Sequence, residues 1–346
     1  MKYGKLIALL CAATVMASCS REVKDTPIPQ ATDSTVDVSS FDKVFTDVRI
    51  DDYWNAETNE IHSLIVLKGG KIIYERYAEG QEPDALHILW SASKTFTATA
   101  IGFAVQEGLL TVDDKVISFF DENELPAEPS DDLKSLTVKH LLTMTSGFAR
   151  DNFASVEAGI VEHPAAEQFS YGFKFTPGDH FEYNSMSTYM LSAIITKLTG
   201  QTVEQYLESR LFEPLGIRRH LWETSTDGYS MGGWGLHITT QSLAKMGQFF
   251  LQRGVWNGKR LLNEEWFDEA MSVQVSTGDG QHGEWSHGYG YQMWKCSVPG
   301  MYRLDGAWGQ FSIIIPDKDA VVACNCHSGN TGRILSSIID NIYKNL

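Results

Sequence analysis

A serine and a lysine three residues apart, Ser91 and Lys94, have the types and spacing that covalent catalysis needs. Residues three apart on a helix share a face, so the two side chains can meet. A serine hydroxyl is a weak nucleophile that needs an adjacent base, and a lysine supplies one where burial or nearby cations favour its neutral form. At a helix N-terminus the backbone N–H of Ser91 is also unpaired and can donate to an oxyanion. This stretch can therefore supply a nucleophile, a base and an oxyanion donor.

The same spacing occurs three times in the chain, so the motif alone decides little; its three copies are Ser40–Lys43, Ser91–Lys94 and Ser242–Lys245. Apolar stripes at helical spacing follow the first and the third copy, and such stripes are typical of ordinary amphipathic helices. After Lys94, residues 96–105 leave almost no polar face, which predicts a buried helix. A buried lysine requires a partner or a task, so context favours the second copy as the functional one.

The first residues predict export. Lys2 and Lys5 precede an apolar run that is too short to span a bilayer, as in a secretory signal peptide over residues 1–18. The run ends in Met16-Ala17-Ser18-Cys19, which resembles the lipobox of bacterial lipoproteins, in which the cysteine is lipidated. Ordinary cleavage with an incidental Cys19 is the alternative.

Residues 19–39 are rich in Ser, Thr, Asp and Pro, and this composition predicts a flexible tether behind the lipidated Cys19. We therefore expect an exported bacterial lipoprotein, anchored in the periplasm or on the outer membrane. Its contact with the membrane is expected only through the lipid, because no other segment is apolar enough to cross a bilayer.

The charge of the chain excludes one class of partner. The formal net charge is −16, and it becomes −18 without residues 1–18, which hold two lysines and no acid. Phosphate binding needs a basic face, so no nucleic-acid partner is expected.

Outside the signal peptide and Cys19, the cysteines are Cys296, Cys324 and Cys326, an odd number that leaves at least one thiol free or paired between chains. Cys324 and Cys326 should point to one face of a strand and His327 to the other. A metal site there lacks a fourth ligand, so we expect no metal.

From residue 40 to residue 346 the patterns predict one α/β (α+β) domain, an antiparallel sheet flanked by helices. Two apolar runs around Lys68-Gly69-Gly70-Lys71 predict a hairpin with a primed turn. Helical patterns at residues 41–48 and 334–342 should cover the sheet, and the Ser91 helix should end at Gly108. Further strands are predicted at 289–294, 301–304, 311–315 and 320–324.

Residues from about 110 to about 225 carry helix signals without strand pairs, which predicts an inserted helical domain. Thr137 can cap one of its helices, a second helix is predicted from Tyr189 to Leu198, and Thr202 with Gln205 forms a capping box for the next.

Two further stretches carry chemical side chains. Tyr183 lies in Phe181-Glu182-Tyr183-Asn184-Ser185, a loop just before a helix, where it can face a cleft, although a tyrosine at such a junction is more often a packing residue. The stretch Asp305-Gly306-Ala307-Trp308-Gly309-Gln310 leads into an apolar strand. Its glycines either let the backbone approach a ligand closely or mark a bulge.

Taken together, Ser91-x-x-Lys94, Tyr183-x-Ser185 and Gly306-Ala307-Trp308-Gly309-Gln310, in that order, resemble the serine β-lactamase and penicillin-binding-protein superfamily. The similarity is greatest to its class C-like hydrolases, including 6-aminohexanoate-dimer hydrolases and related esterases. It runs from about residue 40 to the C-terminus and implies a β-lactamase/transpeptidase-like fold. Supporting stretches are Leu141-Leu142-Thr143-Met144-Thr145-Ser146-Gly147, Pro214-Leu215-Gly216-Ile217 and Gly233-Trp234-Gly235-Leu236.

The resemblance implies a role for each chemical residue. Ser91 is the acylated nucleophile, Lys94 its base and Tyr183 the proton shuttle to the leaving group. The oxyanion lies between the backbone N–H groups of Ser91 and Ala307. No cofactor is expected. We further assign substrate binding to Ser185, Asp305, Gly306 and Trp308.

Two departures from the family pattern shift the expected substrate. Many members have Tyr-x-Asn, whereas Ser185 stands at the third position here, as in the 6-aminohexanoate-dimer hydrolases. Where β-lactamases carry Lys-Thr-Gly, this chain has Leu304-Asp305-Gly306, so the cation that meets a β-lactam carboxylate is absent. Arg303 is adjacent but should point to the other face.

The sequence therefore predicts a serine hydrolase that acts through an acyl-enzyme on a small-molecule ester or linear amide. One alternative is a β-lactamase or D-Ala-D-Ala carboxypeptidase. The other is a non-catalytic ligand-binding lipoprotein that keeps an inherited cleft.

Overall fold

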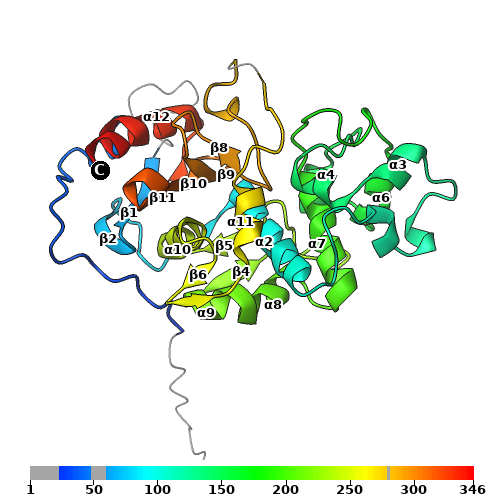
Figure 1. Cartoon of the computed structure of the whole chain (residues 1–346), viewed down its shortest axis with the longest axis horizontal. Helices are drawn as coiled ribbons and strands as arrows, with labels where there is room; N and C mark the ends of the chain where they lie inside the picture. The colour runs from blue at the N-terminus through cyan, green and yellow to red at the C-terminus, as the bar shows by residue number, and fades with distance from the viewer. Residues whose placement is uncertain (1–22, 48–59, 279–280) are drawn as a thin grey trace, which may run out of the picture.

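The computed structural model describes residues 23–47, 60–278 and 281–346 (Figure 1). The predicted signal peptide and Cys19 lie outside these residues, so export and lipidation remain predictions. Within the described ranges, none of the helices is long and apolar enough to cross a membrane.

An antiparallel sheet of six strands forms the body of the molecule, as the sequence predicts. The strand predicted at residues 289–294 is wrong in its bounds, because only Trp294–Lys295 pairs in the sheet. The predicted hairpin is confirmed, and both of its turn residues, Gly69 and Gly70, have the positive φ of a primed turn (+57° and +74°). In spatial order the strands are β2 (Lys71–Tyr77), β1 (Glu60–Lys68), β11 (Ala320–His327), β10 (Gln310–Ile315), β9 (Tyr302–Gly306) and β8 (Trp294–Lys295).

Helices cover both faces of this sheet, so its strands are apolar on both sides. Leu64 and Val66 of β1 share a core with α1 (Lys43–Asp47) and α12 (Thr331–Asn341), which come from the two ends of the chain. The alternate residues Ile65 and Leu67 share a core with α10 (Thr240–Leu251) and α2 (Ser93–Gln106) on the other side. Figure 1 shows α10 and α12 on opposite sides of the strands.

A group of helices lies beside the sheet body, at the right of Figure 1. Both predicted caps are present: the Thr137 side chain accepts a hydrogen bond from His140 N–H, and Thr202 forms a capping box with Gln205. The helices labelled there are α3 (Asp131–Ser135), α4 (Val138–Leu142), α6 (Pro164–Ser170) and α7 (Ser185–Thr199). The same part of the chain holds α5 (Phe153–Glu157), α8 (Val203–Leu207) and α9 (Glu213–Leu215), and the last two are drawn below the sheet body.

The range predicted as a helical insertion without strand pairs, from about 110 to about 225, holds one strand near its C-terminal end. Strand β4 (His220–Trp222) falls inside residues 110–225 and pairs with β5 (Leu236–Ile238), which also pairs with β3 (His87–Ile88) just before Ser91. The remaining elements are β6 (Val255–Trp256), β7 (Lys259–Arg260) and α11 (Glu264–Ala270).

The predicted flexible tether, residues 19–39, is described from Val23 onward, and there it contacts the domain. The Asp25 carboxylate accepts hydrogen bonds from the backbone N–H groups of Arg218 and Arg219 and from the hydroxyls of Thr239 and Ser242. Around Asp25 the segment is therefore bound to the surface of the domain, where one carboxylate accepts from four donors.

The three described cysteines are free and buried. Cys324 and Cys326 pack in one core cluster and His327 is exposed, which confirms the predicted alternation along β11. The described ranges hold no group of three His, Cys, Asp or Glu side chains that could bind a metal ion.

Candidate active site

A sharp turn presents Ser91 at the start of the buried helix. Residues Trp90–Ala92 form a 3₁₀ turn, and α2 begins at Ser93, two residues later than the sequence suggests. Trp90 has φ +47°, in the left-handed region that a bulky side chain rarely adopts. This conformation reverses the chain between β3 and α2, so the surrounding packing must hold the backbone of the turn in a strained state.

The Lys94 amine reaches three oxygen atoms although its side chain is only 1% exposed. Its Nζ lies 3.0 Å from Ser91 Oγ, 3.2 Å from Ser185 Oγ and 2.7 Å from the carbonyl oxygen of Gly233. A neutral amine has two N–H donors and one lone pair. If Gly233 and Ser185 accept the two hydrogens, the lone pair remains for the hydroxyl proton of Ser91.

Electrostatics favour the neutral form of this amine. Burial lowers the pKa of Lys94 to about 7, and the charges of Asp151 and Asp305 limit the shift. An amine with a pKa near neutrality is a suitable general base at physiological pH.

The third Ser-x-x-Lys shows that burial alone does not define such a site. Burial also lowers the pKa of Lys245, to about 8, but its Nζ donates to the carbonyl oxygen of Gly216 at 2.9 Å. The Ser242 hydroxyl donates to Asp25 instead. Of the two copies compared here, only Ser91–Lys94 brings its serine and lysine side chains into contact, as the context of the motif predicts.

Tyr183 lies beside the same serine. Burial raises the pKa of the Tyr183 phenol, and the nearby Ser91 hydroxyl limits the shift. The ring centroid of Tyr183 is 5.0 Å from Lys94 Nζ, and the ring stacks on Trp294 at 5.7 Å. The phenol therefore stays protonated near neutral pH and has a proton to donate.

The start of α7 fixes the segment that carries Tyr183. The Asn184 side chain caps the helix by accepting from Ser187 N–H, and the Asp151 carboxylate accepts from the N–H groups of Ser185 (2.8 Å) and Met186 (3.2 Å). A carboxylate at this end also complements the helix dipole.

The end of β9 packs directly on the Ser91 turn. A Cβ atom placed on Gly306 would lie 2.1 Å from the carbonyl oxygen of Leu89 and 3.2 Å from the amide nitrogen of Ala92. Glycine is thus required because two backbones of this chain meet here. Within the described residues, neither the Ser91 N–H nor the Ala307 N–H donates a hydrogen bond. Both remain available to an oxyanion.

Trp308 lies on the surface just beyond these donors. It is 42% exposed, has φ +66°, and stacks on His327 with ring centroids 4.9 Å apart. A cavity of about 480 Å³ opens at this position, and its lining residues are Ala307, Trp308, Ser328, Gly329 and Thr331.

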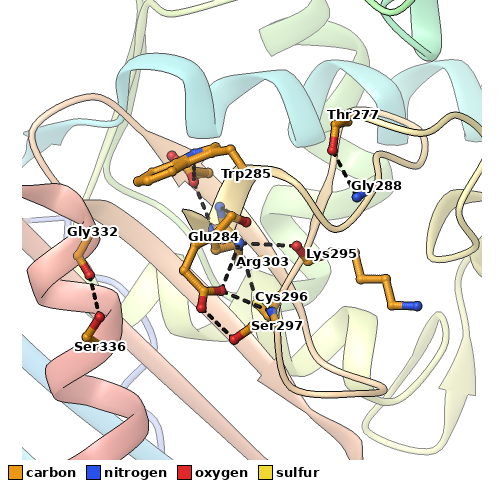
Figure 2. A network of polar contacts seen from close by, with 11 residues as sticks. Thr277, Glu284, Trp285, Gly288, Lys295, Cys296, Ser297, Arg303, Gly332 and Ser336 are labelled. Atoms are coloured by element: carbon orange, nitrogen blue, oxygen red, sulfur yellow. Dashed lines mark hydrogen bonds and ion pairs between the residues drawn. The ribbon is translucent and has the colours of Figure 1, made fainter. Parts of the chain in front are cut away.

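Arg303 is fully buried and centres a polar network (Figure 2). Its Nε donates to Asp305 Oδ2 at 2.8 Å, and its other nitrogens reach the carbonyl oxygens of Glu284 and Lys295. As predicted, Arg303 lies on the opposite face of β9 from Leu304, and it shares a face with Asp305 because residues two apart on a strand do so.

The structure thus brings Ser91, Lys94, Tyr183 and Ser185 into one constellation, with Gly306 packed on the nucleophile turn. Sequence reasoning missed Asp151, which follows no recognisable motif. It also missed the Gly233 carbonyl, although Gly233 opens one of the stretches that carry the family resemblance.

Comparison with known proteins agrees with this geometry. A family model described as Beta-lactamase matches residues 62–335. A 6-aminohexanoate-dimer hydrolase of Paenarthrobacter ureafaciens is 24% identical over 281 residues, 75% of this chain and 71% of the relative. An uncharacterized protein of Alkalihalophilus pseudofirmus is 27% identical over 242 residues, 61% of this chain and 65% of the relative.

Solved structures share the fold at lower identity. A D-stereospecific amidohydrolase from a Streptomyces species has a TM-score of 0.69 at 17% identity, covering 90% of this chain and 100% of its own. EstCE1, described as a hydrolase with promiscuous acyltransferase activity, has a TM-score of 0.68 at 16% identity, covering 88% and 98%. These likenesses agree with the predicted antiparallel sheet flanked by helices.

Proposed function

Because the chain belongs to the beta-lactamase family and is a serine hydrolase, we propose that it cleaves a small ester or linear amide through an acyl-enzyme on Ser91. The observation that carries the proposal is the contact between a buried amine and a serine hydroxyl, 3.0 Å from Lys94 Nζ to Ser91 Oγ. Hydrolase relatives support the reaction class.

Acylation follows from the positions of these groups. Lys94 Nζ takes the proton of the Ser91 hydroxyl as Oγ bonds to the substrate carbonyl carbon. The backbone N–H groups of Ser91 and Ala307 donate to the oxyanion. Tyr183 gives its phenol proton to the leaving oxygen or nitrogen as the bond to the carbonyl carbon breaks, and the phenolate takes the proton held by Lys94.

Water completes the cycle. A water molecule attacks the acyl carbon and gives its proton to the same basic groups, the bond to Ser91 Oγ breaks, and the serine regains its hydrogen. The products are a carboxylic acid and the alcohol or amine released earlier. Each residue returns to its starting protonation state, so no cofactor is needed.

The environment of Arg303 argues against a β-lactam or another substrate with a carboxylate beside the scissile bond. Its guanidinium is fully buried and already paired with Asp305. Turning it toward a substrate anion would leave that carboxylate buried without its partner, which is costly. We therefore expect turnover of p-nitrophenyl esters and little or no turnover of nitrocefin.

The test is intact mass of the domain, lacking residues 1–22, after reaction with a fluorophosphonate probe. One adduct is expected on the wild type and none on Ser91→Ala, and p-nitrophenyl ester turnover should be lost with it. Ser242→Ala and Lys245→Met, in the third Ser-x-x-Lys, are matched controls that should keep the adduct and the turnover.

Two outcomes would count against the proposal. An adduct and full turnover in folded Ser91→Ala would refute the assignment of the nucleophile. A folded wild type with neither adduct nor turnover of any ester or amide would favour the non-catalytic binding protein instead.

A further inference from the structure

A second cavity lies where the N-terminal segment crosses the domain. Its volume is about 840 Å³, compared with about 480 Å³ for the cavity at Trp308. Its walls come from residues 26–29, from α9 and the turn after it, from α10, and from β6 and the turn after it. None of the described residues that line it belongs to the Ser91 constellation. In Figure 1 the blue N-terminal segment meets α9 and β6 below the sheet body, whereas β9 lies in the upper half of the view.

The N-terminal segment is a fixed wall of this cavity. The Thr26 N–H donates to the carbonyl oxygen of Gly216 at 2.9 Å, and the Ile28 N–H donates to Gln241 Oε1 at 3.2 Å. A Cβ atom placed on Gly216 would lie 2.5 Å from the side chain of Thr26, so glycine permits this close approach. Because these contacts hold the segment against the domain, the cavity is formed before any ligand binds.

Two polar side chains of α10 line the cavity without a full set of protein partners. Lys245 and Gln248 are three residues apart, so they share a face of the helix, and they are only 2% and 3% exposed. Lys245 Nζ donates to the carbonyl oxygen of Gly216 at 2.9 Å, its one hydrogen bond among the described residues. The Gln248 amide makes none there, and its Oε1 is buried without a partner. Buried polar groups are normally paired, so the amine and the amide both have N–H donors left for a ligand.

The charges of the lining favour an anion. Lys245 and Arg218 are cations, and Glu213 is the one carboxylate among the described residues that line the cavity. Asp25 is close enough to raise the pKa of Lys245, but it forms no ion pair with the amine, and its oxygens already accept from four donors. The buried amine thus lacks a carboxylate of its own in the described part of the chain.

The other walls of the cavity are largely apolar. Pro27 and Ile28 come from the N-terminal segment, Pro214 from α9, and Val255 and Trp256 from β6. The Trp256 ring is partly buried against the main core, which limits its motion. Apolar walls around a few convergent polar groups are typical of sites for small organic molecules.

We propose that this cavity binds an organic carboxylate, whose oxygens accept hydrogen bonds from Lys245 and Gln248 and whose apolar part packs against Trp256. A carboxylate carries two acceptor oxygens for the two donor groups, and the apolar walls suit an organic tail better than an inorganic anion. The site is separate from Ser91, so the inference does not rest on the proposed hydrolase function.

The test compares 4-phenylbutyrate, 4-phenylbutanol and 4-phenylbutylamine, which share a ring and a chain length and differ in the head group. In isothermal titration calorimetry on the whole chain, Kd should be about tenfold lower for the carboxylate than for the alcohol, and highest for the amine. Lys245→Met should raise the Kd of the carboxylate about tenfold, and Gln248→Leu should raise it severalfold. Lys94→Met, which removes the buried lysine of the other site, is the matched control and should leave this Kd unchanged.

A second measurement on the wild type does not depend on the stability of any variant. Because a ligand in the cavity contacts residues 26–29, 4-phenylbutyrate should slow proteolysis around position 25, and 4-phenylbutanol at the same concentration should not.

Three results would overturn the proposal. They are no binding of 4-phenylbutyrate at millimolar concentration, equal Kd for the acid and the alcohol, and an unchanged Kd in folded Lys245→Met. Binding that is lost in Lys94→Met but kept in Lys245→Met would place the carboxylate at Ser91 and would also overturn it. None of these results bears on the hydrolase function, which the Ser91 adduct tests separately.

Discussion

The carbonyl oxygen of Gly233 lies 2.7 Å from Lys94 Nζ, on a segment 139 residues further along the chain. This bond holds the amine in place because a carbonyl oxygen can only accept, so one hydrogen of the amine must point at it. Because Ser185 can accept the second hydrogen, the lone pair of the neutral amine points toward Ser91. The base is therefore oriented by a backbone group that no substitution of a side chain removes.

The pH dependence of kcat/KM should report on this amine. Because the pKa of Lys94 is lowered to about 7 by burial, the neutral base forms as pH rises through that value. We expect kcat/KM for a neutral ester to fall about tenfold per pH unit below the pKa and to reach a plateau above it.

The plateau should continue to at least pH 9, because burial keeps the pKa of Tyr183 above its usual value of 10. Steady-state rates measured from about pH 5 to about pH 9.5 check both the acid limb and the plateau. An acid limb with a midpoint below about 5.5 would contradict Lys94 as the base.

Gly306→Ala tests the contact between β9 and the nucleophile turn. The added Cβ would lie 2.1 Å from the carbonyl oxygen of Leu89, so one of the two backbones must move. We expect a loss of about 1–3 kcal/mol in the free energy of unfolding from overpacking. Misplacing an oxyanion donor should lower kcat on the order of a hundredfold.

Gly332→Ala is the matched control, because a Cβ there meets only the Trp285 ring at an ordinary 3.8 Å. Urea unfolding and ester turnover of the two variants give the comparison. Full activity in Gly306→Ala would show that the positions of the oxyanion donors do not depend on the close contact between β9 and the Ser91 turn.

The sequence was sufficient for the sheet, the buried helix and the central Ser-Lys pair, because each follows from local periodicity or spacing. The hairpin around Gly69 and Gly70 and the caps at Thr137 and Thr202 depend on residues within a few positions of one another. Such local rules survive folding because no tertiary contact competes with them at these places.

The remainder depends on contacts between distant segments, which spacing does not reveal. Asp151 and the Gly233 carbonyl reach the site through loops. The Asp25 segment looked like a linker because its composition is polar, yet its carboxylate is matched to donors almost 200 residues away. The role of Arg303 could not be predicted from the sequence, because it depends on Glu284 and Trp285 folding back over β9.

Arg303→Met should destabilise the protein strongly. The guanidinium is fully buried between Asp305 and Glu284, and its removal leaves two carboxylates in that environment without their cation. Breaking a buried pair in this way costs about 3–5 kcal/mol. Lys344→Met removes an exposed ion pair with Asp340 and should change stability by less than about 1 kcal/mol.

Chemical denaturation of both variants at neutral pH measures the difference. The destabilisation of Arg303→Met should shrink in the double variant Arg303→Met, Asp305→Asn, because the second change removes one unpaired charge. Additive losses in the double variant would mean that Arg303 stabilises the fold through packing alone.

Asp25→Ala tests whether the N-terminal segment is fixed to the domain. The substitution deprives the N–H groups of Arg218 and Arg219 and two hydroxyls of their acceptor, which should cost about 2 kcal/mol. Although burial opposes ionisation, the N–H groups of Arg219 and Arg218 hold the pKa of Asp25 below its usual 3.8. The stabilisation by ionised Asp25 is therefore fully present above pH 3.8, and it is lost as the pH falls through the lower pKa that Asp25 has in the folded state.

The free energy of unfolding, measured between about pH 3 and about pH 7, should be higher for the wild type than for Asp25→Ala. This difference should shrink as the pH approaches about 3. Proteases should cleave the residues around position 25 faster in Asp25→Ala, and Asp33→Ala, which changes a carboxylate in the same segment, is the control. Catalysis should be unaffected, because Asp25 acts on Lys245 rather than on Lys94. Equal proteolysis of all three proteins would mean that the Asp25 bonds do not hold the segment, and that it behaves as the tether its composition suggests.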